Sequence, residues 1–155
     1  MSQTAYDLVP AAAFAGMLAD LTDHVIETLV ADESDIGFGL AVAQGDDDTS
    51  CELPDNTGDK IRGVSMHKHC ETGQYETGEV VSLLRRGKIW VNVDATVTKG
   101  GDVYVKHNSS NGTFLAADDA GNASKLAGAV WGSSRTGAGL VVLEVDLVGT
   151  AGAMS

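Results

Sequence analysis

The first 59 residues contain no lysine or arginine, although they carry 13 aspartates and glutamates. Residues 60–155 hold 9 acidic and 10 basic side chains, so the net charge of −12 arises in the first third. Such acidity argues against nucleic acid or an anionic membrane as a partner. Self-repulsion disfavours compaction of this third, which we expect to reach away from the domain or to lie along an oppositely charged partner. A solvated acidic face is the open alternative.

Proline and cysteine each occur only twice, whereas glycine occurs 19 times. This balance indicates a turn-rich chain and excludes a proline-rich linker. No positive charge precedes the apolar stretch around residues 11–21, and no run is long enough to span a membrane. We therefore expect no signal peptide, and free thiols at Cys51 and Cys70 in a reducing compartment.

Apolar and polar residues alternate with the period of two that is typical of β-strands. Residues 78–106 are predicted to form three consecutive strands, with turns at residues 85–88 and 99–101. Residues 36–43 and 140–148 show the same alternation as continuous strands. About eight strands at this spacing, without a strong helix, predict an all-β fold, either a small β-barrel or a jelly-roll-like sandwich.

The chain divides into an extended N-terminal arm (residues 1–30), a β-domain (31–148) and a flexible tail (149–155) on this interpretation. Regular alternation begins only after His24, so residues 1–23 are expected to lie outside the core. The regular apolar faces of two strands predict four core positions, namely Ile89, Val91, Val141 and Leu143.

The sequence shows no catalytic signature, and we expect neither an enzyme nor a cofactor. His67, His69 and Cys70 form the one cluster with metal-capable side chains, and Cys51 is the only obvious fourth ligand. A structural zinc site needs four converging ligands, so a polar loop after a strand is the favoured interpretation and no metal is expected.

Arg85, Arg86 and Lys88 form a basic turn on an acidic protein. They could grip an acidic partner or the acidic arm of a neighbouring subunit, or they could form an ordinary charged turn. An alternative function is a soluble carbohydrate- or ligand-binding β-module, with its platforms at the aromatic residues Trp90, Tyr104 and Trp131. An exposed row of these rings would favour that module, whereas burial would not.

Four segments resemble a known family, the cement or decoration proteins that reinforce the capsids of tailed bacteriophages. The segments are IGFGLAV at 36–42, Gly63-Val64, YETGEVVSLLRRGKIWV at 75–91 and VTKGGDVYV at 97–105. The similarity extends in order and spacing over about residues 15–145.

This resemblance implies a non-enzymatic virion protein that is made in the host cytoplasm and binds the outer surface of the major capsid shell. It implies a homo-oligomer, a dimer or trimer at symmetry positions, whose arm clamps the capsid or sister subunits. The candidate contacts lie in the arm and in the basic turn and are Phe14, Met17, Leu18, Asp20, Asp23, Arg85, Arg86 and Lys88.

Overall fold

The computed structural model describes residues 13–33, 35–70, 72–148 and 152–155. These residues form eleven strands and one short 3₁₀ helix, η1, so the expected all-β fold is confirmed. No helix among them is long and apolar enough to cross a membrane. The elements are β1 (Val25–Ala31), β2 (Ile36–Gly37), β3 (Ala41–Gln44), β4 (Ser50–Glu52), β5 (Ile61–Ser65), β6 (Gln74–Tyr75), β7 (Val80–Val93), β8 (Asp102–Lys106), β9 (Phe114–Leu115), η1 (Asp119–Gly121), β10 (Ala123–Trp131) and β11 (Gly139–Asp146).

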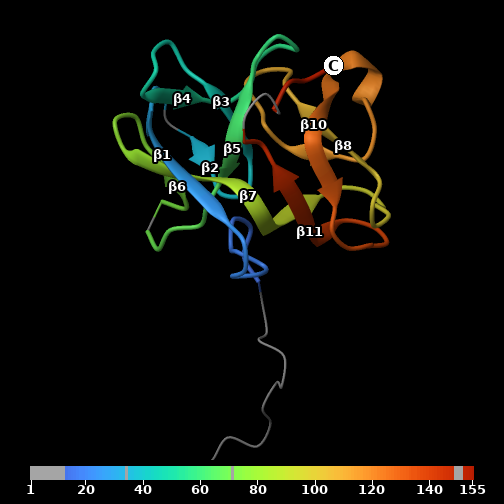
Figure 1. The fold of residues 1–155 in the computed structure, drawn as a ribbon. Coiled ribbons are helices and arrows are strands. Elements are labelled where there is room, and N and C mark those ends of the chain that lie inside the picture. The colour runs from blue at the N-terminus through green and yellow to red at the C-terminus, as the bar shows by residue number, and fades with distance from the viewer. Residues whose placement is uncertain (1–12, 34, 71, 149–151) are drawn as a thin grey trace, which may run out of the picture.

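Five strands close into a ring in the order β1, β4, β3, β5, β7 (Figure 1). The ring closes because β1 pairs in parallel with β4 and antiparallel with the first part of β7. Apolar side chains of these strands fill its interior, together with side chains from β2 and β6, which pair as a separate two-stranded sheet. We call this interior the first core; it consists of Leu29, Ala31, Ile36, Val42, Cys51, Leu53, Tyr75, Val81 and Leu83.

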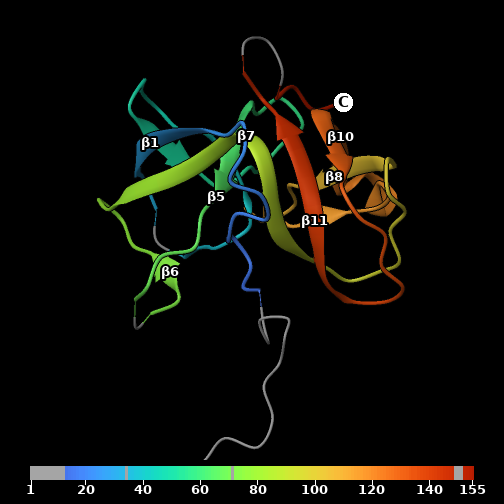
Figure 2. The same cartoon turned by 60° about the horizontal axis from the view of Figure 1, so that its bottom comes forward.

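The second part of β7 continues into another group of strands, in the order β7, β11, β10, β8, β9. Figure 2 shows β11 beside β7 on this side of the molecule. The strands enclose a second core, which also takes in Ile61, Val64 and Leu84 from the ring. The ring is a small barrel, and β11, β10, β8 and β9 are the strands added to it around the second core. The four predicted core positions lie in the second core and are at most 1% exposed, which confirms them: Ile89, Val91, Val141 and Leu143.

The predicted turn at residues 85–88 is wrong, because β7 runs without a break from Val80 to Val93. The pairing with β1 jumps from Leu84 to Arg86, which leaves Arg85 as an extra residue in the ladder. Such a bulge bends a strand and increases its twist without ending it. Gly87 follows with φ of +136°, a conformation that glycine accepts readily. Residues 85–88 therefore lie at a bend inside β7, between the part that lines the first core and the part that lines the second. They do not form the tip of a hairpin.

The predicted continuous strand over residues 36–43 is also wrong. Its ends form β2 and β3, and the chain turns between them at Phe38 and Gly39, where Gly39 has φ of +72°. The Ser65 hydroxyl stabilises this turn by donating to the Gly37 carbonyl over 2.6 Å, while its oxygen accepts from the Leu40 N–H. A polar residue distant in the sequence thus overrides the local alternation.

Both ends of the domain differ from the expected boundaries. β1 begins at Val25, within the segment assigned to the arm. At the other end, residues 152–155 fall in the expected flexible tail, yet Met154 is buried and Ser155 exchanges two backbone hydrogen bonds with Lys125. Backbone pairing and burial of an apolar side chain fix this part of the tail to β10.

Candidate interaction surface

Residues 13–24, which we call the arm segment, lie against one edge of β7. The N–H groups of Gly16 and Ala19 donate to the carbonyls of Trp90 and Lys88, each over 2.8 Å. Trp90 returns a hydrogen bond of 2.9 Å to the Met17 carbonyl. The segment therefore acts as a short antiparallel strand that covers the part of β7 following its contact with β5.

Gly16 fixes the arm segment to the loop after β5. Its φ is +87°, and its carbonyl accepts from the His67 N–H over 2.8 Å. A Cβ atom at this position would lie 2.5 Å from that nitrogen, which is too close for any side chain. Residues 1–23 were expected to lie outside the core; the described part instead includes buried Gly16, and Leu18, which packs against the second core.

Three apolar side chains of the arm segment face outward. Phe14 is 55% exposed, Met17 37% and Leu21 77%, and we call these residues the arm ridge. Exposed apolar side chains that gather on one segment are typical of an interaction site. The backbone between Phe14 and Leu21 is held by β7 at residues 16, 17 and 19, which limits the movement of the ridge.

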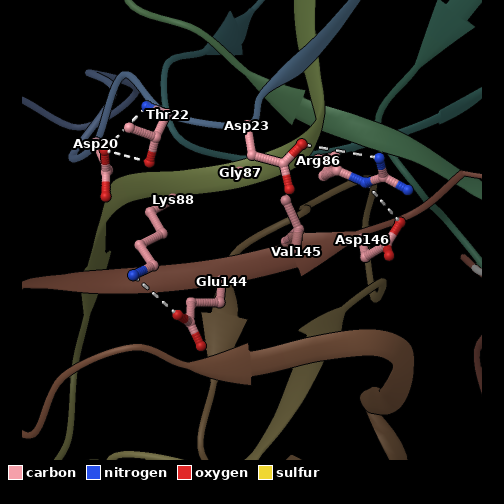
Figure 3. A pocket seen from close by; sticks show the side chains of 9 residues that line it. All are labelled: Asp20, Thr22, Asp23, Arg86, Gly87, Lys88, Glu144, Val145 and Asp146. Atoms are coloured by element: carbon pink, nitrogen blue, oxygen red, sulfur yellow. Dashed lines mark hydrogen bonds and ion pairs between the residues drawn. The ribbon is translucent and has the colours of Figure 1, made fainter.

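A groove of about 580 Å³ separates the arm segment from β11, and we call it the charged groove (Figure 3). Lys88 pairs with Glu144 over 3.3 Å, and Arg86 lies 3.5 Å from Asp146 and 3.9 Å from Asp23. Asp20 completes the charged lining, where four carboxylates face two cations. The predicted contacts Asp20, Asp23, Arg86 and Lys88 thus come together at one site.

Hydrogen bonds favour the charged form of one of these carboxylates. Asp20 accepts from the Thr22 N–H over 2.9 Å and from the Thr22 hydroxyl over 2.8 Å. These bonds favour the charged form and lower the pKa of Asp20 below its ordinary value. Asp23 is 85% exposed, so its carboxylate is open to solvent despite the distant pair with Arg86. The groove therefore presents negative charge at its arm side.

Arg85 does not belong to this surface. It is mostly buried, lies 3.2 Å from Glu27 through Nε, and donates to the Leu147 carbonyl over 2.9 Å. Its Nε–H is nonetheless not aimed at an acceptor, so the contact with Glu27 is an ion pair without a hydrogen bond. Glu27 also binds Arg62 over 2.9 Å. We conclude that Arg85 joins strands within the domain.

The histidine and cysteine cluster lies in a loop after β5, as interpreted from the sequence. No group of three potential metal ligands occurs among the described residues. Cys51 is buried in the first core, and burial, aided by nearby carboxylates, raises the pKa of its thiol to about 12. Because metals bind the thiolate, Cys51 is a poor fourth ligand.

The aromatic residues of the alternative binding module do not form an exposed row. Trp131 is 1% exposed and its indole N–H donates to the Asp102 carbonyl over 3.0 Å. Trp90 and Tyr104 are partly buried in β7 and β8. A tryptophan that is enclosed and hydrogen-bonded in this way supports the fold and offers no face for stacking a ligand.

Two features of the surface were not predicted from the sequence. Glu144 and Asp146 reach the groove because β11 pairs with β7 in the register Glu144 to Lys88 and Asp146 to Arg86. The His67 ring contacts both Phe14 and Phe38, and these three side chains help to line a second groove of about 360 Å³. The alternation in residues 140–148 indicates that Glu144 and Asp146 lie on the polar face of a strand. Only the pairing of β11 with β7 shows that this face borders the groove.

Comparisons with known proteins agree with this architecture. Residues 1–146 match the family model described as structural cement protein (E217 gp24/Pam3 gp6). A chain in the structure of the capsid of Myoviridae phage XM1 superposes with a TM-score of 0.72 at 19% identity, covering 93% of this chain and 98% of that one. The head fiber gp8.5 N base of bacteriophage phi29 gives a TM-score of 0.49 at 17% identity, covering 80% and 95%. No curated protein matched the sequence.

The match to a family of structural cement proteins identifies this small β-barrel with added strands as a structural protein of the virion. The family match extends over nearly the whole chain, and the chain belongs to the structural cement proteins of bacteriophages. At 19% identity, the similarity to the phage XM1 capsid chain establishes a shared fold. The resemblance in the sequence is therefore confirmed.

Proposed function

We propose that this protein binds the outer surface of the major capsid shell, bridges neighbouring capsomers and so stabilises the phage head. The observation that carries the proposal is the arm ridge, which exposes Phe14, Met17 and Leu21 on a segment whose residues 16, 17 and 19 are hydrogen-bonded to β7. A fixed apolar ridge loses little conformational entropy when a partner covers it, which favours docking.

The charged groove sets the orientation in which the protein docks on the capsid subunit. Asp20 and Asp23 face its arm side, and Lys88 and Glu144 face its β11 side. We infer that basic side chains of the capsid subunit approach Asp20 and Asp23 while apolar side chains cover the ridge. Charge pairs of this kind orient a complex and speed its formation more than they tighten it.

The contact of one copy need not be strong. A shell offers many equivalent sites, and a protein that touches two capsomers at once converts its second contact into an intramolecular one. We further propose that copies meet as a dimer or trimer at the symmetry positions of the shell. Weak contacts repeated in this way stabilise the shell against rupture.

Co-sedimentation with expanded, undecorated capsids tests the proposal. The wild-type protein is expected to bind, and the double variant Phe14→Ser/Leu21→Ser to bind at least tenfold more weakly while its β-domain stays folded by circular dichroism. Val80→Ser is the matched control, because Val80 is 59% exposed but lies at the far end of β7 from the arm segment. Failure of the wild type to bind, or equal loss in the control, contradicts the proposal.

A further inference from the structure

His67 connects the arm segment to two other parts of the domain. Its ring stacks on Phe14 with centroids 5.2 Å apart and planes inclined by 16°. Phe38, from the turn between β2 and β3, meets the same ring edge-on at 4.9 Å. The imidazole therefore lies between a ring of the arm and a ring of the barrel, an arrangement that aromatic groups favour.

The barrel side of this contact is itself supported. Phe38 packs edge-on against Tyr75 at 5.5 Å, and the Tyr75 hydroxyl donates to the Met66 carbonyl over 2.7 Å. The Lys68 ammonium lies 4.7 Å from the centre of the Tyr75 ring and is paired with Glu79. His67 thus rests on a connected set of side chains that reaches the first core.

The backbone of His67 holds the same segment. Its N–H donates to the Gly16 carbonyl, two residues after Phe14. Phe14 and Met17 are joined in turn, because the Met17 N–H donates to the Phe14 carbonyl over 3.1 Å. One residue therefore grips the start of the arm ridge through its ring and through its main chain.

We propose that His67 is a positioning residue for capsid docking, which clamps the arm segment so that Phe14 and Met17 face the shell in a fixed arrangement. The inference rests on the proposed function, since the clamp matters to docking only if the ridge docks. Without the ring contact, the ridge would sample many arrangements, and a partner would have to order it on binding.

The contact requires a flat ring and does not depend on a charge. His67 is exposed, and the described residues that line the groove with it are aromatic or alanyl on the arm and turn side, with Lys68, His69, Cys70 and Gly73 on the side of its own loop. Phenylalanine keeps a ring in this place, whereas alanine removes it. The pair of substitutions therefore separates stacking from other properties of histidine.

Hydrogen exchange and capsid binding together test the clamp. In His67→Ala, the amides of Gly16 and Ala19 are expected to exchange about threefold to tenfold faster, the range that corresponds to one aromatic pair. Binding to undecorated capsids is expected to weaken by a similar factor. His67→Phe should restore both values. His69→Ala is the matched control, because His69 is exposed on the same loop without a ring contact to the described arm segment.

Each outcome decides a separate point. Unchanged exchange in His67→Ala overturns the clamp, whatever the capsids show. Faster exchange with undiminished binding, or a failure of His67→Phe to restore binding, overturns its role in docking. If the wild-type protein binds no shell, the proposed function fails and the docking role fails with it, while the exchange data still decide whether His67 clamps the arm segment.

Discussion

The two parts of β7 serve different cores. In the first part, Val81 and Leu83 point into the ring and are fully buried in the first core. In the second part, Ile89, Val91 and Val93 point into the second core, as Leu84 already does. The first core lies within the ring and against β2 and β6, whereas the second core lies between the other strands and the outer faces of β3 and β5.

This difference teaches how the chain makes one folded unit from two cores. The change of face occurs at the extra residue Arg85, where the strand bends. Glu27, Arg62 and Arg85 meet at this point from β1, β5 and β7. A single strand that belongs to both cores couples their stability, so we expect the described domain to unfold in one cooperative transition.

The largest effect is expected from removing a buried leucine on either side of β7. Leu83→Ala and Leu143→Ala, in the first and second core, should each lower the free energy of unfolding by about 2–5 kcal/mol, since each leaves a cavity. Chemical denaturation followed by fluorescence and circular dichroism would measure both. Two separate transitions in either variant would show that the cores are independent.

Removing the carboxylate at the bend should have the next largest effect. Glu27→Gln leaves Arg62 and Arg85 facing each other without a negative charge, and we expect a loss of about 2 kcal/mol. The loss should shrink as salt is raised, because ions screen the remaining repulsion. Thermal melting at two salt concentrations would test this. An unchanged melting temperature would mean that the bend does not depend on these charges.

Gly16→Ala should change the stability of the whole domain less than it changes the attachment of the arm segment to β7. A side chain at φ of +87° and 2.5 Å from the His67 nitrogen forces the segment away from β7. We expect a loss of about 1–3 kcal/mol and rapid exchange of the Ala19 amide. Gly137→Ala is a control for the backbone conformation alone, since Gly137 has φ of +75° in open space. Equal effects in both would rule out a specific contact at Gly16.

The smallest effect on stability is expected in the charged groove. The pair between Lys88 and Glu144 is exposed, so Lys88→Gln should change the free energy of unfolding by less than about 0.5 kcal/mol. Its effect on capsid binding should appear mainly as an altered dependence on salt. Urea melts and co-sedimentation at low and high salt would measure the two. A loss of stability above 1 kcal/mol would mean that the pair holds β11 to β7.

The sequence predicted the all-β class and the core of β11 because these depend on local alternation. Val141 and Leu143 follow a strict period of two, and burial of one face dictates their direction. The bend in β7 was missed for the opposite reason. Charged residues with a glycine are typical of turns, and only the pairing of Arg86 with Val25 and with Asp146 shows that the strand continues.

The candidate surface was predicted in part. The acidic composition and the late start of alternation pointed to Asp20, Asp23 and the arm, and the structure brings these aspartates beside Lys88. Composition could not show that Leu18 packs inward or that Arg85 turns to Glu27, because both follow from the path of the arm segment and from the bulge. The local pattern of apolar and polar residues does not determine which distant segments pair, or in which register.

The position of the arm segment on β7 has a consequence before any capsid is met. The N–H and C=O groups of Trp90 and the carbonyl of Lys88 would otherwise form an open strand edge, which is a template for joining another chain. The protein covers this edge with its own residues 16–19. Another copy of the chain therefore cannot add a strand at this edge, because the backbone groups that it would bind are already paired.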